Sequence, residues 1–264
     1  MKLIYWNTKN QSDFAVIKDI IIDESPDILF LAETDANLLK NQSDVLKDCS
    51  YEHFDNPGCS RIVILRKTKL KLSLGRQDNY YTTLRDLTTN IFYISVHLPS
   101  QMFQHMDALK SFIRTFRGEI DDEIGNSSKQ DILIIGDFNV NPFEKPMIDF
   151  DGFSASNSKS HRKEVTHLRS KKELYYNPTW TMYGKNNFPG TKYFRRPSAS
   201  SFDILEHHYL DQVVLSYSLS QKLTSESINV LEFTTNKTFF DSTSNSILQS
   251  DHLPLIYEFK INTP

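Results

Sequence analysis

The fold is decided by the stretch Asp131-Ile132-Leu133-Ile134-Ile135-Gly136-Asp137-Phe138-Asn139. Four consecutive aliphatic residues of this kind are typical of a buried strand, and the residues that follow deliver Asp137 and Asn139 to the same side of its end. A second stretch, Ser250-Asp251-His252-Leu253-Pro254, places a carboxylate and an imidazole directly before another apolar run. Acidic, amide and imidazole groups are what a protein needs to hold a hard cation and split a phosphoester.

The composition fits one large folded domain. With 264 residues, of which 39% are hydrophobic and 12% aromatic, the chain can bury a sizeable core. No Pro-, Gly- or Ser-rich linker divides the sequence, so we expect a single domain over residues 1–264. The formal net charge of −3 argues against a protein that coats nucleic acid through charge alone, and it leaves room for a local basic surface.

The expected location in the cell follows from three features. No run of about 18 apolar residues is present, so neither a membrane span nor a membrane partner is expected. Strand-like sequence begins at Lys2, which leaves no room for a signal peptide. Cys49 and Cys59 lack the spacing of a metal site, and a single bridge between them is the alternative to two free thiols. We therefore expect a cytoplasmic protein.

Apolar periodicity predicts a chain in which strands and helices alternate. Helices are predicted from Phe14 to Pro26, over residues 38–46, and along the apolar stripe from Met102 to Phe116. Strands are predicted near residues 2–6, 27–32, 51–55, 61–66, 69–74, 79–87, 90–96, 132–135, 210–215 and 255–259. Residues 152–209 are polar and irregular, and we expect an insertion there.

Polar residues stand at or just beyond the ends of these apolar strands. They are Asn7, Glu33, His97, Asp137, Asn139, Asp211, Asp251 and His252. Each has an ordinary explanation when taken singly, because an Asn after a strand is usually a turn residue, a lone Glu is usually solvated and an Asp before a helix is usually a cap. Eight such coincidences together favour a functional site.

The same residues lie in motifs that resemble the endonuclease/exonuclease/phosphatase superfamily, in that family's order. The matching pieces are Ile4-Tyr5-Trp6-Asn7, Pro26 to Thr34, Val96-His97-Leu98-Pro99, Gly136-Asp137-Phe138-Asn139, Leu210 to Ser216, and Ser250-Asp251-His252-Leu253-Pro254. The resemblance covers nearly the whole chain, and its specificity rests on the fourth and last pieces. It implies an α/β fold, a four-layer sandwich of two packed β-sheets flanked by helices, with one metal-dependent site where the strand ends of both sheets meet.

The resemblance also implies metal ligands. Glu33 would be the principal ligand of Mg²⁺ or Mn²⁺, with Asn7 and Asp251 nearby, because a hard cation takes oxygen ligands. The metal would neutralise the phosphate and the leaving oxygen.

The remaining strand-end residues would carry the chemistry. Asp137 would position or deprotonate the attacking water, and Asn139 would orient water and phosphate oxygens. His252, oriented by Asp211, would clamp the scissile phosphate. His97 would contact the phosphate from the other side. The family's deoxyribonucleases provide a carboxylate partner for this second histidine, for which Glu52 is the nearest candidate here.

Two basic segments could contact nucleic acid. Residues 159–172 carry six Lys or Arg against one Glu, and residues 191–196 mix cations with aromatics. The substrate contacts we predict from them are Lys171, Lys172, Arg195 and Arg196. A solvated loop is the alternative for the first segment, and aromatic packing into the core is the alternative for the second.

The leading hypothesis is a divalent-metal-dependent phosphodiesterase that cuts DNA internally, by in-line attack of water. His97 favours the deoxyribonuclease and phosphatase branches, because abasic-site endonucleases usually have tyrosine there. The alternatives are a phosphatase or phosphodiesterase of a small or lipid phosphate ester, and a catalytically inactive member used for binding.

Overall fold

Two β-sheets form the centre of the molecule. The computed structural model describes residues 1–10, 13–100, 106–125, 129–159, 162–184, 190–193, 205, 207–244 and 246–262. Within them, a six-stranded sheet has the order β16-β19-β1-β2-β4-β3, and a seven-stranded sheet has the order β5-β6-β7-β8-β15-β12-β9. Both sheets mix parallel and antiparallel neighbours.

The strand bounds match most of the predicted strands. The first sheet consists of β1 (Lys2–Asn7), β2 (Ile28–Ala32), β3 (Tyr51–Phe54), β4 (Ile62–Lys67), β16 (Leu223–Val230) and β19 (Leu255–Ile261). The second consists of β5 (Leu72–Asp78), β6 (Tyr81–Asp86), β7 (Phe92–His97), β8 (Ile132–Asp137), β9 (Ala155–Ser156), β12 (Tyr175–Tyr176) and β15 (Asp211–Ser216). Small two-stranded pairs are β10 (Glu164–His167) with β11 (Ser170–Glu173), β13 (Lys192–Tyr193) with β14 (His207–His208), and β17 (Phe240–Asp241) with β18 (Ser246–Ile247).

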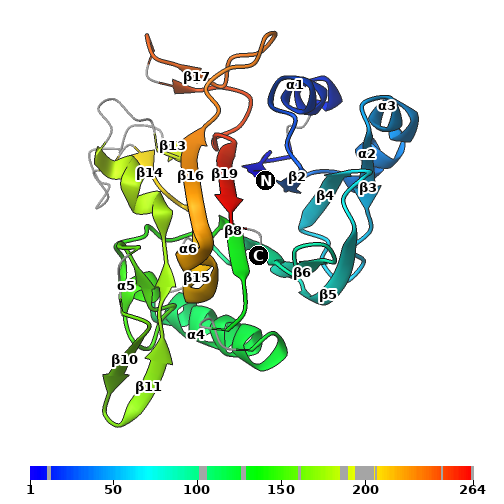
Figure 1. The fold of residues 1–264 in the computed structure, drawn as a ribbon. Coiled ribbons are helices and arrows are strands. Elements are labelled where there is room, and N and C mark those ends of the chain that lie inside the picture. The colour runs from blue at the N-terminus through cyan, green and yellow to red at the C-terminus, as the bar shows by residue number, and fades with distance from the viewer. Residues whose placement is uncertain are drawn as a thin grey trace.

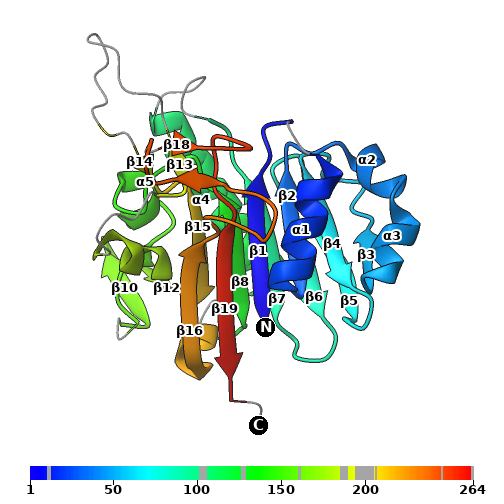
Figure 2. The same cartoon turned by 90° about the horizontal axis from the view of Figure 1, so that it is seen from above.

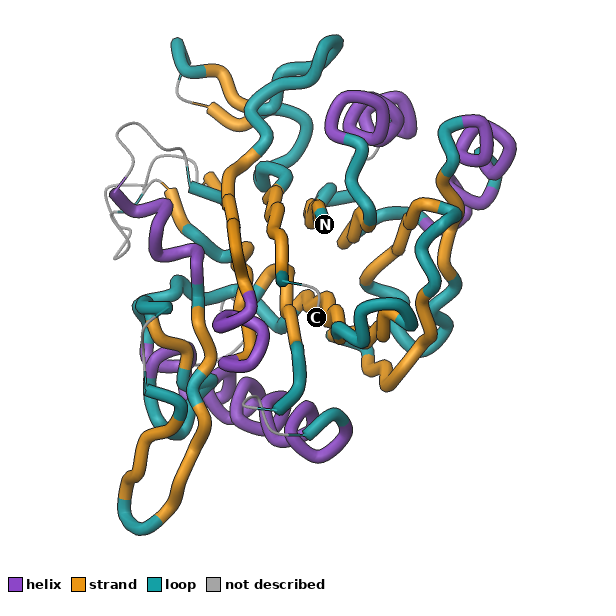
Figure 3. The backbone as a smooth tube through the Cα atoms, in the orientation of Figure 1, coloured by secondary structure: helices purple, strands orange, loops and turns teal. Residues whose placement is uncertain are grey.

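Helices cover the outer faces of the two sheets, so the predicted layered α/β architecture is confirmed (Figures 1 and 3). The first sheet is flanked by α1 (Phe14–Glu24), α2 (Ala36–Lys40) and α3 (Ser43–Asp48), and the second is flanked by α4 (Met106–Glu123). Shorter helical segments are α5 (Lys145–Ile148), η2 (Pro178–Gly184) and α6 (Tyr217–Lys222). None of the helices in the described ranges is long and apolar enough to cross a membrane.

The core lies between the sheets and beneath α4. One cluster of buried apolar side chains takes Leu3, Ile4 and Phe30 from the first sheet together with Leu133 and Val213 from the second. A second cluster joins the other face of the seven-stranded sheet to the apolar stripe of α4. The expectation of a single domain stays a prediction, and the core shared by both sheets supports it.

Glycine is required at one strand position that positions the site. Gly136, the last residue but one of β8, has φ +150°, and a Cβ there would lie 2.0 Å from the backbone oxygen of Val96. The parallel strands β7 and β8 therefore approach closely at the point where His97 and Asp137 leave them.

Three sequence predictions differ from the structure. The helix expected over residues 38–46 is divided into α2 and α3, with Asn41 and Gln42 between them. The segment 152–209 is not uniformly irregular, because within its described part it forms β9 to β14 and η2, and β9 and β12 extend the second sheet. Strand β16 was not predicted, because its sequence, LTSESINV, is mostly polar and it lies at the edge of its sheet. Cys49 and Cys59 are both free thiols.

Candidate active site

Sheet register brings the predicted residues to one end of both sheets. Parallel pairing of β7 with β8 sets His97 beside Asp137, and antiparallel pairing of β8 with β15 sets Asp137 beside Asp211. In the other sheet, β1 and β2 run parallel and end together at Asn7 and Ala32, which places Glu33 just beyond that edge. The strand ends of both sheets thus meet at one place, as predicted.

The centre of the site is a histidine held by a carboxylate. His252 Nδ1 lies 2.8 Å from Asp211 Oδ2, and both side chains are almost completely buried. Burial alone would lower the pKa of His252, but the adjacent Asp211 carboxylate raises it above its ordinary value. His252 Nδ1 is therefore engaged by Asp211, which leaves Nε2 as the ring nitrogen open to another partner.

The backbone around His252 is fixed by the first strand. The indole nitrogen of Trp6 donates to the His252 carbonyl at 3.0 Å, and Ser250 Oγ donates to the Asn7 carbonyl at 2.7 Å. Ser250 Oγ also accepts the His252 N–H at 3.2 Å. The Ser-Asp-His segment is thereby tied to β1, although some 245 residues separate the two in sequence.

A second histidine lies between two carboxylates. His97 Nε2 is 3.4 Å from Glu33 Oε1 and 4.0 Å from Asp137 Oδ2. Burial lowers the pKa of His97 below its ordinary value, although Asp137 and Glu33 oppose this. His97 Nδ1 is buried and has no hydrogen-bond partner in the part of the chain that the structure describes. Glu52 does not supply one, because its carboxylate pairs with Arg66 at 2.7 Å.

Asp137 is held in place by Asn139, two residues after it. Its Oδ1 accepts the Asn139 backbone N–H at 2.8 Å, and the Asn139 side-chain amide donates to the Leu98 carbonyl, also at 2.8 Å. Asn139 therefore holds the loop after β7 against the loop after β8. Its predicted contact with water or phosphate stays a prediction.

Two site residues have left-handed backbone conformations. Glu33 has φ 50° and Asn139 has φ 52°, although neither is glycine. Such conformations are uncommon outside glycine and persist where the surrounding structure imposes them. At Glu33 the backbone N–H donates to the Arg61 carbonyl, which helps to hold this turn.

The residues around Glu33 fit a hard cation in part. The Glu33 carboxylate is about one-third exposed and accepts one hydrogen bond, from Asn7 Nδ2 at 3.1 Å. The Asn7 oxygen instead accepts the Lys9 backbone N–H at 3.0 Å. Asp251 Oδ2 pairs with the Lys9 ammonium at 2.8 Å. Burial would raise the pKa of Asp251, but His252 and Lys9 hold it below its ordinary value. Glu33 is thus the oxygen donor most ready for a metal, and ligation by Asn7 and Asp251 stays a prediction.

One other arrangement could hold a cation. Among the described residues, Asp137, Asp211 and His252 offer ligand atoms that all lie within 4.8 Å of one another, and all three are buried. Asp211 Oδ1 also has no hydrogen-bond partner among those residues. Two of the three groups already contact each other, because His252 Nδ1 lies 2.8 Å from Asp211 Oδ2.

Two cations near the site were not predicted. Lys9 follows Asn7 by two residues and pairs with Asp251, and the guanidinium of Arg61 lies 4.7 Å from the centre of the Tyr80 ring. The Tyr80 carbonyl in turn accepts the His97 backbone N–H. The spacing after Asn7 could have revealed Lys9 from sequence, whereas Arg61 reaches the site through strand pairing and left no local signal.

The predicted substrate contacts lie in two different situations. Lys171 and Lys172 belong to the β10–β11 hairpin, which projects from the body of the molecule (Figure 1). Lys171 pairs with Glu164 at 2.8 Å, and the Lys172 ammonium donates to the carbonyls of Phe150 and Gly152. Both charges are therefore engaged by acceptors within the protein. Their contact with substrate stays a prediction, and Arg195 and Arg196 lie outside the described residues.

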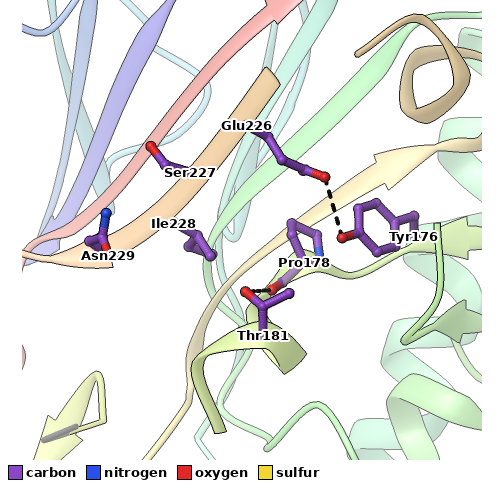
Figure 4. A pocket seen from close by; sticks show the side chains of 7 residues that line it. All are labelled: Tyr176, Pro178, Thr181, Glu226, Ser227, Ile228 and Asn229. Carbon is purple, nitrogen blue, oxygen red and sulfur yellow. Dashed lines mark hydrogen bonds between the residues drawn. The ribbon is translucent and has the colours of Figure 1, made fainter. Parts of the chain in front are cut away.

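A separate pocket of about 330 Å³ lies between β16 and η2 (Figure 4). Its lining includes Tyr176, Thr181 and Glu226, and the Tyr176 hydroxyl donates to Glu226 at 3.4 Å. No residue of the strand-end site lines this pocket. The chemistry-bearing residues are therefore concentrated at the strand ends.

This geometry agrees with the comparisons to known proteins. The model of the endonuclease/exonuclease/phosphatase family matches residues 4–252, so the chain belongs to this family, whose members are hydrolases of phosphate esters. No curated protein matches the sequence.

Solved structures share the fold at low sequence identity. The catalytic domain of human Nocturnin, with bound sulfate, is 16% identical, with a TM-score of 0.58 over 99% of this chain and 94% of that one. An AP endonuclease from Archaeoglobus fulgidus is 14% identical, with a TM-score of 0.60 over 99% and 100%. A 3′ phosphatase from Neisseria, bound to a product DNA hairpin, is 15% identical, with a TM-score of 0.55 over 98% and 99%.

Proposed function

We propose that this protein is a divalent-metal-dependent phosphodiesterase that hydrolyses nucleic acid, most specifically an endonuclease acting on DNA. The observation that carries the proposal is the convergence of the buried His252–Asp211 pair with His97, Asp137 and Glu33 at the strand ends of both sheets. Family membership supports phosphoester hydrolysis, and two of the structural neighbours named above are described as an AP endonuclease and as a phosphatase bound to DNA.

Each side chain of the site has a separate role in the proposed in-line attack of water on the phosphodiester. Asp137, fixed by the Asn139 N–H, accepts the proton of the attacking water. Charged His252 presents Nε2 to a phosphate oxygen while Asp211 holds its other nitrogen, and this stabilises the negative charge that develops in the transition state. His97, next to Glu33, contacts the phosphate from the second sheet's side. Mg²⁺ or Mn²⁺ held by Glu33 would neutralise phosphate charge and stabilise the leaving oxygen.

The direct test is an assay of the purified protein on supercoiled plasmid, linear duplex, single-stranded DNA and RNA, each with Mg²⁺, Mn²⁺ or EDTA. We expect nicking or linearisation of plasmid with either metal and none with EDTA. Glu33→Gln should lose at least about a hundredfold of that activity with little change in unfolding temperature, because a charged ligand is lost without a change in volume. Glu258→Gln is the matched control, because this exposed glutamate lies opposite Lys2 in the β1–β19 strand register, at the end of β1 away from the site.

A small phosphate ester is the second candidate substrate. The net charge of −3 and the engagement of Lys171 and Lys172 by Glu164 and backbone carbonyls both favour it. Salt dependence separates the candidates, since each phosphate contact with a nucleic acid releases counterions and a small ester shows little of this effect. Cleavage that is unchanged by salt, with a preference for a small ester over plasmid, would contradict the nuclease proposal.

A further inference from the structure

Four aromatic side chains form a connected cluster next to the candidate active site. Phe143 lies 6.4 Å from Trp180 and 5.8 Å from Tyr183, measured between ring centres. Trp180 and Tyr183 are 5.9 Å apart, and Tyr183 is 4.0 Å from Tyr209. The rings come from the loop after β8, from η2 and from the segment that enters β15.

The cluster is joined to the catalytic strands by a short network of hydrogen bonds. Tyr209 precedes Asp211 by two residues, and its backbone N–H donates to Asn141 Oδ1 at 3.0 Å. The Asn141 amide also lies 3.0 Å from His208 Nδ1. Asn141 itself follows Asn139 by two residues. The rings therefore begin about two residues, or roughly 7 Å of chain, from Asp211.

Two rings of the cluster are exposed, which is unusual for the aromatic side chains that the structure describes. Of the described aromatic side chains, only Phe143, Tyr183 and Phe233 are classed as exposed, and two of these three contact each other here. Phe143 and Tyr183 are each 39% exposed, whereas Tyr209 beneath them is buried. Single exposed aromatics need no explanation, but the planes of Phe143 and Tyr183 are inclined at 68°, and Tyr209 packs against Tyr183. A planar ligand can therefore stack on one of the two exposed rings and meet the other edge-on.

A neighbouring acidic group indicates which part of a nucleic acid would lie there. The Glu144 carboxylate accepts the Asn141 backbone N–H at 2.6 Å. Burial raises the pKa of Tyr183, and the Glu144 carboxylate, which places a negative charge near the ring, raises it further. A phosphate would be repelled from this surface, whereas an uncharged base would not.

We propose that Phe143 and Tyr183 form a platform for an unpaired nucleobase adjacent to the scissile phosphate, in which the base stacks on one ring and meets the other edge-on. The proposal rests on the nucleic-acid function proposed above and deepens it. A base paired within a duplex offers its faces only to its neighbours, so such a platform takes a base from a single strand, a frayed end or an extruded nucleotide. The preferred substrate is therefore nucleic acid with single-stranded character at the cut.

The test compares two oligonucleotides that carry the same phosphates. One is oligodeoxythymidylate of about twelve nucleotides, and the other is an abasic backbone of equal length. Binding of each is measured by fluorescence anisotropy in EDTA, so that no cleavage occurs. The parent protein should bind the base-bearing strand roughly fivefold to a hundredfold more tightly, the range for one stacked base.

Substitutions test whether the two rings cause this difference in affinity between the strands. Phe143→Ala and Tyr183→Ala should bring the ratio close to one, whereas Tyr183→Phe should keep it, because the ring remains. Leu87→Ala is the control, since Leu87 is an exposed apolar residue in the turn before β7, at the end of the strand opposite His97. Thermal unfolding of each variant reports whether it is folded.

A second measurement needs no variant. Trp180 belongs to the cluster and the other tryptophan, Trp6, is buried in the core, so the base-bearing strand should quench emission more than the abasic one does. Equal binding and equal quenching by the two strands would overturn the platform, as would an unchanged ratio in both alanine variants. If the plasmid assay shows cleavage in that case, the nuclease proposal stands and only the platform fails. If no nucleic acid is cut but the base-bearing strand still binds more tightly than the abasic one, Phe143 and Tyr183 bind a base and the nuclease proposal fails.

Discussion

The strand-end site and the β10–β11 hairpin both carry charged residues in the sequence, but these residues make different kinds of contact in the structure. At the strand ends, Asp211 and His252 are buried and contact each other at 2.8 Å across 41 residues of chain. On the hairpin, Lys171 pairs with Glu164 only seven residues away. The first arrangement is made by sheet register, and the second by a local surface contact.

The difference shows which polar patterns in a sequence allow the position of a side chain to be predicted. A polar residue at the end of a buried strand has its position fixed by the pairing of that strand, and burying it is costly unless it finds a partner. A surface lysine is free to take the nearest acceptor, and an exposed ion pair contributes little. Strand-end patterns therefore predict which side chains converge better than runs of charge do.

The largest expected effect concerns the buried pair. His252→Ala should lower turnover by about 10²–10⁴-fold, because the charged donor to the phosphate is lost. Asp211→Asn should act through the same unit, so the double variant should lose far less than the product of the two single losses. The measurement is kcat on a small chromogenic phosphodiester, and multiplicative losses would show that Asp211 does not orient His252.

A smaller effect concerns the pH dependence of the same pair. Because Asp211 raises the pKa of His252, the charged imidazole persists to higher pH than in a free histidine, and activity should fall only as pH rises through that raised value. In Asp211→Asn, only Asp137 still opposes the effect of burial on the His252 pKa, so the fall in activity should move to lower pH. The variant should thus be more impaired at about pH 8 than at about pH 6, judged by kcat/KM. The pKa of His97 is shifted in the opposite direction, because burial lowers it.

Adjacent lysines of the hairpin give the smallest effect. Burial lowers the pKa of Lys172 to about 8, and its ammonium donates to two backbone carbonyls. Lys172→Met should therefore cost about 1–2 kcal/mol in urea unfolding, from two lost hydrogen bonds. Lys171→Met, next to it but fully exposed, should leave stability nearly unchanged. If Lys172→Met keeps full stability and instead raises KM for long DNA, the hairpin is a substrate contact after all.

The central strands could be predicted from sequence because continuous apolar runs indicate that they are buried. Ile28–Ala32 and Ile132–Ile135 are buried throughout, so no polar alternation obscures them. Edge elements carry no such run. In β16 only Ile228 and Val230 are buried, and β9 and β12 are two residues long, so their pairing depends on the rest of the sheet.

The site was predictable as a set of residues and less so as a set of contacts. Strand ends indicated which side chains converge, but the partner of each depends on rotamers and neighbours set by packing. The Lys9 ammonium on Asp251 and the Asn139 amide on the Leu98 carbonyl are examples. The spacing after Asn7 points to Lys9 as a residue near the site, but nothing in the local sequence points to its pairing with Asp251 or to the Asn139–Leu98 contact.

The position of β19 has a consequence for the order of assembly. This last strand lies inside its sheet, between β16 and β1, and it directly follows the Ser-Asp-His segment (Figure 2). The candidate site is therefore complete only when β19 has paired with β1, a contact of very long sequence separation and slow to form. During synthesis, Glu33 and Asp137 emerge before His252, so the proposed activity has to await this long-range pairing.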